Sequence, residues 1–234
     1  MAQALPLILL PGMMCDAGLY APQLPALAAR GAVQVAPCDT ASTIAEIARA
    51  VLARAPARFA LAGLSMGGIV AMELLAQAPE RVARLALIDT NPLAESAKVQ
   101  HGRAAQIARA EAGELDAMMR DTFLPAYAGD APLPAAIHDI CCDMARNLGA
   151  EVFARQSLAL RDRADRCAAL RAYSGETLVL CGGADRLCPP ARHRLIADLM
   201  PQARLKMLDG IGHLPTLEAP DITTDILLTW LETA

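Results

Sequence analysis

One short segment of the chain has the residue types and spacing that nucleophilic catalysis by a serine requires. Gly63-Leu64-Ser65-Met66-Gly67 follows an apolar run, FALAGL at 59–64, and opens a helical pattern over 66–78. Ser65 is therefore predicted in a sharp turn between a strand and a helix, where flanking glycines let the backbone pass closely. The turn also presents the Met66 backbone N–H at the positive end of a helix, so Met66 is a candidate oxyanion donor.

A serine hydroxyl is a weak nucleophile without a base, and the chain contains four histidines. His213 lies in Gly210-Ile211-Gly212-His213, just after the last predicted strand, where a loop can bring an imidazole over Ser65. His101 and His138 lie in a region of helical patterns, and His193 lies in a predicted helix. His213 is therefore the predicted base, and structural or surface roles are favoured for the other three.

A carboxylate is needed to orient the imidazole, and it should follow the serine and precede the histidine in the chain. Asp185 in CGGADRLCPP meets this condition on the loop after the fifth predicted strand. Asp89 in LALIDTNP, at the end of the fourth strand, is an alternative that could also reach the imidazole, although a turn role suits it. We expect Asp185 to be the third member of a Ser65, His213 and Asp185 triad.

A second oxyanion donor is expected from the loop after the first strand. Leu10-Pro11-Gly12-Met13-Met14-Cys15-Asp16 occupies that place, and the Met13 backbone N–H is the best candidate. The alternative is an ordinary Pro-Gly turn.

Short apolar runs alternate with helical patterns along most of the chain, which predicts a doubly wound α/β fold with a mostly parallel sheet. The predicted strands are 6–11, 33–36, 59–64, 82–89, 177–182 and 203–208, and the predicted crossover helices lie near 21–30, 43–55, 66–78, 189–199 and 220–232. Residues 92–172 show helical patterns only, which predicts a helical cap inserted after the fourth strand. The expected core therefore comprises 1–91 and 173–234.

Composition excludes several other classes of protein. The 234 residues have a net charge of −4 and no long run of like charges, so nucleic acid and anionic membranes are not expected partners. No apolar run approaches the roughly 20 residues of a membrane span. The seven cysteines lack C-x-x-C spacing, which argues against a disulfide framework or a zinc site and favours a cytoplasmic protein.

Several of these motifs together resemble the α/β-hydrolase superfamily, especially its small capped esterases and lactonases. The resemblance rests, in order, on LLPGMMCD, GLSMGG, LALIDTNP, LVLCGGADRLCPP and GIGHLPTLEAP. It implies Ser65 as nucleophile, His213 as base and Asp185 as acid, with the Met13 and Met66 amides in the oxyanion hole. It implies neither a metal nor an organic cofactor. The chain has Pro11-Gly12 where members of the superfamily commonly have His-Gly.

The leading functional hypothesis is a serine hydrolase that acts on carboxylic esters with small, apolar acyl groups through an acyl-enzyme. Enol-lactone opening, carbon–carbon bond hydrolysis and acyl transfer would use the same triad and stay open. A non-catalytic small-molecule receptor on the same fold is a further alternative. In each case the expected partner is a small molecule, such as an ester or a lactone.

Overall fold

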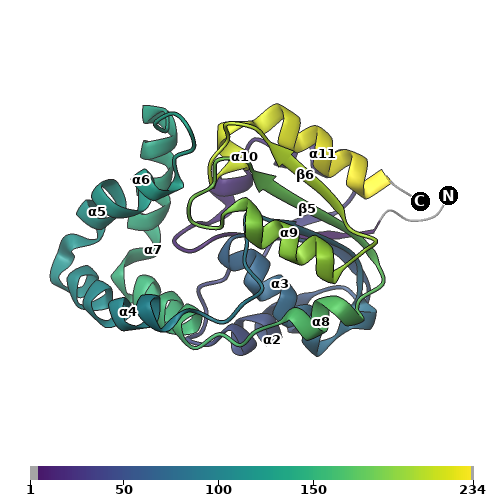
Figure 1. Ribbon diagram of the computed structural model, residues 1–234, viewed down its shortest axis with the longest axis horizontal. Coiled ribbons are helices and arrows are strands. Elements are labelled where there is room, and N and C mark those ends of the chain that lie inside the picture. Colours follow the sequence, from purple (N-terminus) through teal and green to yellow (C-terminus); the bar gives the residue numbers. More distant parts are fainter. Residues whose placement is uncertain (1–4, 233–234) are drawn as a thin grey trace.

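The computed structural model describes residues 5–232, which form one six-stranded parallel sheet covered by helices (Figure 1). The strand order is β2-β1-β3-β4-β5-β6, and every neighbouring pair is parallel. The strands are β1 (Leu7–Leu10), β2 (Val33–Val35), β3 (Phe59–Leu64), β4 (Val82–Ile88), β5 (Glu176–Gly182) and β6 (Arg204–Leu208). The predicted fold class is therefore confirmed, and each predicted strand is present within about two residues of its expected ends.

The position of each strand in the sheet explains its sequence. All residues of β1 and β3 are buried, because these central strands are covered on both faces. The edge strand β6 instead alternates, with Arg204 and Lys206 exposed. Charged side chains on an edge strand also discourage pairing with another chain.

Two layers of helices cover the sheet, and successive residues of β1 contribute to different layers because side chains alternate along a strand. Ile8 and Leu10 pack in the core beneath α2 (Ile44–Arg54), α3 (Met66–Gln77) and α9 (Pro190–Leu199). Leu7 and Leu9 pack in the opposite core, which includes residues of α1 (Leu24–Ala28) and α11 (Pro220–Glu232). These helices were all predicted from the sequence, although α1 is shorter than expected.

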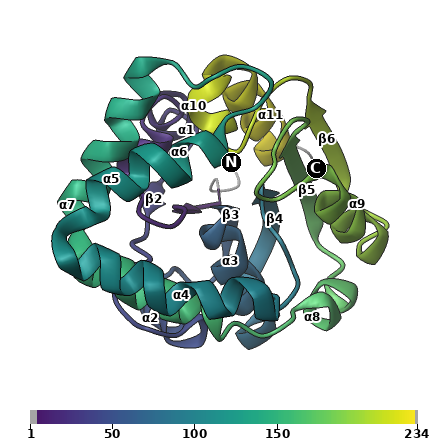
Figure 2. The same cartoon turned by 60° about the vertical axis from the view of Figure 1, so that its left-hand side comes forward.

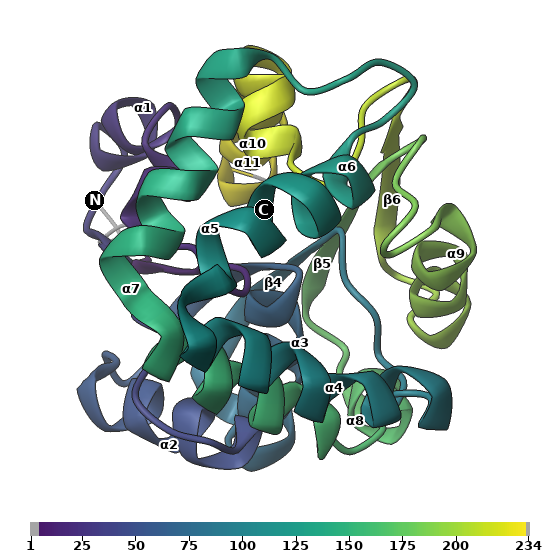
Figure 3. The same cartoon turned by 90° about the vertical axis from the view of Figure 1, so that its left-hand side faces the viewer.

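The segment between β4 and β5 is helical and forms an arch beside the sheet (Figures 1 and 3). It contains α4 (Ala97–Arg109), α5 (Leu115–Met118), α6 (Leu124–Tyr127), α7 (Ala135–Arg161) and α8 (Cys167–Ala172), with wider turns at Ala110–Glu114 and Met119–Phe123. Gly113 and Gly149 have positive φ angles of 88° and 79°, so the helical conformation breaks at both. The last helix, α8, packs beside α3 and α9 of the core. Across residues 5–232, no helix has both the length and the apolar character needed to cross a membrane.

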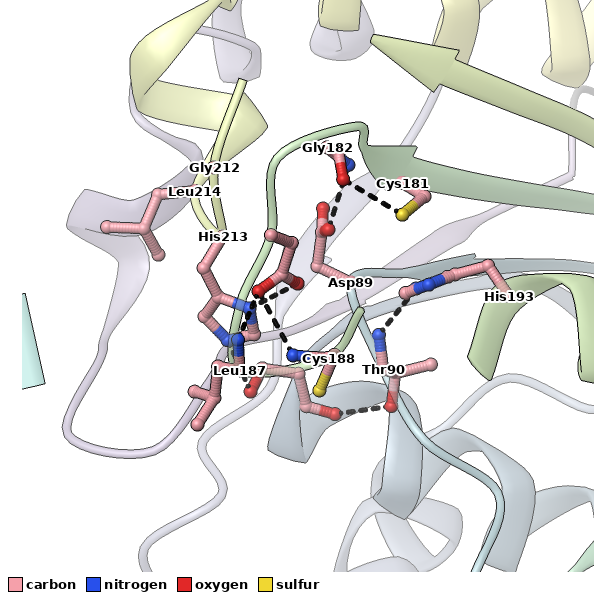
Figure 4. A network of polar contacts seen from close by, with 12 residues as sticks. Asp89, Thr90, Cys181, Gly182, Leu187, Cys188, His193, Gly212, His213 and Leu214 are labelled. Carbon is pink, nitrogen blue, oxygen red and sulfur yellow. Dashed lines mark hydrogen bonds and ion pairs between the residues drawn. The ribbon is translucent and has the colours of Figure 1, made fainter. Parts of the chain in front are cut away.

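A buried histidine connects α9 to the end of β4. His193 is fully buried, and its Nε2 atom accepts a hydrogen bond of 2.9 Å from the Thr90 backbone N–H (Figure 4). The Thr90 hydroxyl in turn donates a 2.8 Å hydrogen bond to the Ser65 carbonyl. Burial lowers the pKa of His193 to about 4, because the charged imidazolium loses its hydration. The neutral ring is therefore part of the support for the turn that contains Ser65.

We predict that His193 makes the fold sensitive to mild acid. An unfolded histidine titrates near pH 6.5, so between pH 6.5 and 4 the unfolded chain binds more protons and stability falls as the pH is lowered. At pH 5 this costs about 2 kcal/mol relative to pH 7. Chemical denaturation at both pH values should show this loss in wild type beyond that of His193→Gln, whose amide oxygen still accepts from Thr90 but does not titrate. Equal losses in both proteins would contradict the assignment.

Candidate active site

Ser65 lies between β3 and α3 in a strained backbone conformation. Its φ and ψ angles are 55° and −115°, which few residues other than glycine adopt. The turn leaves the side chain partly exposed at the carboxyl end of the sheet, while Leu64 and Met66 on either side are buried. Met66 is the first residue of α3.

The two glycines of the motif permit this conformation, as the sequence predicted. A Cβ atom at Gly67 would lie 2.0 Å from the Leu10 carbonyl oxygen of β1, and one at Gly63 would lie 2.3 Å from the Gly67 oxygen. Both distances are far below contact, and each obstacle is backbone that cannot rotate away. The first turn of α3 thus packs directly against β1 and β3, and this contact holds Ser65 in its turn.

A continuous line of hydrogen bonds joins Ser65, His213 and Asp185. Nε2 of His213 lies 2.9 Å from the Ser65 hydroxyl oxygen, and its Nδ1 lies 2.8 Å from Oδ2 of Asp185. An ionised carboxylate only accepts hydrogen bonds, so Nδ1 carries the ring proton. In a neutral imidazole Nε2 is then the free acceptor, and it faces the serine hydroxyl.

Asp185 is held as a carboxylate although it is 2% exposed. Burial alone would raise its pKa, but His213, Asp89 and the Cys188 backbone N–H outweigh burial and lower the pKa to about 2. Its Oδ1 atom accepts 2.8 and 3.0 Å hydrogen bonds from the N–H groups of Leu187 and Cys188 (Figure 4). These bonds fix the carboxylate on the loop after β5.

Asp89, the alternative carboxylate, lies beside Asp185 and bonds elsewhere. Its Oδ1 atom accepts a 2.9 Å hydrogen bond from the Gly182 N–H, and its φ angle is 41°. Burial and the nearby charge of Asp185 raise the pKa of Asp89 well above its usual range. Asp89 therefore joins the ends of β4 and β5, whereas Asp185 bonds to the imidazole.

The loop that carries His213 is held by two residues that sequence reasoning did not single out. Glu218 accepts hydrogen bonds from the N–H groups on both sides of His213, 2.9 Å from Gly212 and 2.8 Å from Leu214. The Tyr127 carbonyl, at the end of α6, accepts a 2.8 Å bond from the His213 N–H, and its ring centroid lies 5.3 Å from that of the imidazole. The histidine is thus fixed by the core on one side and by the insert on the other.

The loop after β1 lies against Ser65 and is rigid around Met13. A Cβ atom at Gly12 would lie 3.5 Å from the Ser65 Cβ, which is ordinary contact. The Gly12 carbonyl accepts a 3.2 Å bond from the Cys15 N–H. Because N–H and C=O point in opposite directions across a trans peptide, this bond also sets the direction of the Met13 N–H. Within residues 5–232, the N–H groups of Met13 and Met66 donate to no other group.

Gln156 of α7 is a further contact that the sequence did not reveal. Its side chain is 1% exposed, and its Oε1 atom accepts a 2.8 Å bond from the N–H of Met14, whose φ angle is 56°. Its Nε2 atom donates a 3.0 Å bond to the Cys38 carbonyl after β2. The insert therefore fixes the loop beside Ser65 through one buried amide. No local motif marks this residue, because its partners are 142 and 118 positions away.

Two sets of side chains have donor atoms within 4.8 Å of one another and could in principle hold a metal: Asp89, Cys181 and His193, and Asp185, Cys188 and His213. Their nitrogen and oxygen atoms already take part in the hydrogen bonds described above. We assign neither set to a metal.

Comparison with known proteins places this geometry among hydrolases. A curated relative, the pimeloyl-[acyl-carrier protein] methyl ester esterase of Aromatoleum aromaticum, is 30% identical over 74% of this chain and 73% of its own. The enol-lactonase of Burkholderia xenovorans has a TM-score of 0.85 at 25% identity, covering 98% of this chain and 92% of that one. A thermophilic esterase from Thermogutta terrifontis shares the fold, with a TM-score of 0.88 at 24% identity over 98% and 90% of the two chains.

Two further curated relatives are much longer, and this chain spans only 31% and 10% of their lengths. The family model for the alpha/beta hydrolase family matches residues 7–226, which is nearly the whole chain. The chain belongs to the alpha/beta hydrolase family.

Proposed function

We propose that the protein is a serine hydrolase of carboxylic esters with small, largely apolar acyl groups. The observation that carries this proposal is the hydrogen-bonded line from Ser65 through His213 to Asp185, at a strained turn at the carboxyl end of the sheet. The Aromatoleum and Thermogutta esterases support it as relatives in sequence and fold. No step of the proposed reaction calls for a metal or an organic cofactor.

In the proposed reaction, Ser65 Oγ attacks the ester carbonyl as His213 Nε2 takes the hydroxyl proton. Asp185 stabilises the imidazolium that forms. Negative charge develops on the carbonyl oxygen, and the N–H groups of Met13 and Met66 are proposed to donate to it. When the carbon–oxygen bond breaks, His213 gives its proton to the leaving alcohol. Water then attacks the acyl-enzyme with His213 again as base, which releases the acid and restores Ser65.

Lactone opening is the second candidate, because the enol-lactonase of Burkholderia xenovorans has the same fold over almost the whole chain. A lactone is an internal ester, so attack by Ser65 proceeds through the same steps, and the alcohol stays attached to the acyl group. Carbon–carbon bond hydrolysis, acyl transfer and a receptor role have no observation in their favour. We propose residues 92–172 as the cap, with 1–91 and 173–234 as the core, although α8 packs on the core helices.

The first test compares three variants in the hydrolysis of short-chain 4-nitrophenyl esters. Ser65→Ala should abolish turnover above background. Asp185→Asn should lower kcat by roughly 10⁴-fold, because an amide favours the wrong imidazole tautomer. Asp89→Asn should stay active within a few fold, because its amide can still accept from Gly182 and carries no charge beside Asp185. Full activity in Ser65→Ala would contradict the proposal, and a larger loss in Asp89→Asn than in Asp185→Asn would transfer the orienting role to Asp89.

The second prediction concerns Gln156 as a positioning residue for the Met13 amide. Gln156→Met leaves the Met14 N–H without its acceptor, so the loop loses its alignment and kcat should fall roughly ten- to hundredfold with little change in KM. Affinity for an alkylboronic acid, which forms a tetrahedral adduct on the serine, should fall by a similar factor, while the midpoint of the pH–rate profile stays the same.

Gln23→Met is the matched control for Gln156→Met. Gln23 is also fully buried, and its amide donates a 2.9 Å bond to the Thr216 carbonyl. This control should lose stability and keep kcat. If Gln156→Met retains wild-type kcat and boronic acid affinity, the amide has only a structural role.

A further inference from the structure

The insert buries two arginines around a single carboxylate. Glu95 accepts a 2.8 Å bond from Nη2 of Arg103, a 3.1 Å bond from its Nε and a 2.8 Å bond from Nη1 of Arg163. The three side chains are 4%, 10% and 9% exposed for Glu95, Arg103 and Arg163. This Arg103–Glu95–Arg163 cluster therefore has one positive charge more than its negative charge, in a place with little access to water.

The two arginines differ in how well the protein satisfies them. Arg163 also donates to the backbone carbonyls of Leu93, at 3.0 Å, and Leu160, at 3.3 Å. Nη1 of Arg103 instead faces the thioether sulfur of Met13 at 3.7 Å, and sulfur is a weak acceptor. A buried charge without a counterion is costly by several kcal/mol. The surplus positive charge thus has a donor group at Arg103 that lacks an oxygen partner.

Arg103 lies beside the proposed site. Met13, its contact, belongs to the loop packed against Ser65. Arg103 is also close enough to Tyr127 that its charge lowers the pKa of the phenol, although burial acts more strongly and raises that pKa. The ring of Tyr127 packs on the imidazole of His213. Figure 2 shows α4, which carries Arg103, in the arch formed by the insert.

We propose that the physiological ester carries a carboxylate group and that Arg103 binds this group beside Met13. The inference rests on the proposed hydrolase function and names its substrate class. A guanidinium donates to carboxylate oxygens in a charge-assisted geometry that a thioether does not replace. One carboxylate also balances the surplus of one charge, whereas a phosphate monoester would exceed it. The acyl stem remains apolar, as the proposed function requires.

The test uses pairs of esters that differ only in a terminal carboxylate. The 4-nitrophenyl monoesters of adipic and suberic acid are compared with the hexanoate and octanoate, which have acyl chains of equal length. Acetates of 4-hydroxybenzoate and 4-cresol test a carboxylate in the alcohol part. For each pair, the ratio of kcat/KM is measured in wild type and in Arg103→Met, so that intrinsic reactivity cancels.

Arg103→Met should lower the preference for the carboxylate ester roughly ten- to hundredfold in at least one pair, mainly through KM. Arg103→Lys keeps the charge without the planar fork, so it should restore part of the preference. Thermal stability should hold or rise in Arg103→Met, because Glu95 and Arg163 then form a balanced pair. A purely structural role for Arg103 predicts the reverse, with lower stability and an unchanged preference.

The control is Arg166→Met, which removes an arginine whose Nε donates a 2.6 Å bond to Glu73 and which begins α8 on the core. This variant should keep the wild-type preference. A measurement on wild type alone adds a second test: suberate should inhibit octanoate ester hydrolysis more strongly than octanoate does.

The possible failures are distinguishable. If wild type hydrolyses neither neutral nor charged esters, the proposed function itself is wrong. If it hydrolyses the neutral esters but shows no preference that depends on Arg103, and suberate is no better an inhibitor than octanoate, then the carboxylate subsite is wrong and the hydrolase proposal stands.

Discussion

The close approach of α3 to β1 and β3 determines the rest of the site. Gly67 and Gly63 let the backbones come so near that no side chain fits between them, and Ser65 is left with a φ angle of 55°. Such a conformation costs of order 1–3 kcal/mol, so the surrounding packing must hold it. Thr90 contributes by bonding to the Ser65 carbonyl, and His193 holds Thr90 in turn. The support for the serine therefore extends from the centre of the sheet to α9.

The insert is as much a part of this arrangement as the sheet. The Tyr127 carbonyl anchors the His213 backbone, the Gln156 amide anchors Met14, and Arg103 contacts Met13. These contacts come from different helices of the insert, α6, α7 and α4. A helical insert that only covered the site would not need buried polar bonds to the loops on either side of Ser65. We infer that it also positions those loops.

Much of the fold was predictable, because buried parallel strands and their crossover helices leave strong local patterns in the sequence. Ser65, His213 and Asp185 were singled out for the same reason, since each occupies a loop at the carboxyl end of a predicted strand, and the structure brings their side chains within hydrogen-bond distance. The sequence alone left Asp89 as an alternative to Asp185. Separating them requires the direction of each side chain, which depends on the sheet register and on the Gly182 N–H.

The supporting residues could not be predicted, because their partners are distant along the chain. Glu218 bonds to backbone N–H groups, and Gln156 bonds to loops more than a hundred residues away. A glutamine or glutamate in a helical pattern is ordinarily a surface residue, so composition gives no hint of burial. The Arg103–Glu95–Arg163 cluster was hidden for the same reason, since its unequal charges become apparent only when the three side chains are seen together.

The central claim is that His213 activates Ser65 as a nucleophile, and the rate of covalent labelling by a fluorophosphonate tests it most directly. Mass spectrometry of the intact protein gives the rate, and peptide mapping gives the site. Wild type should gain one adduct, on Ser65, and His213→Ala should react slower by several orders of magnitude while remaining folded. Labelling of Ser65 at the wild-type rate in His213→Ala, or an adduct on another residue, would contradict the account.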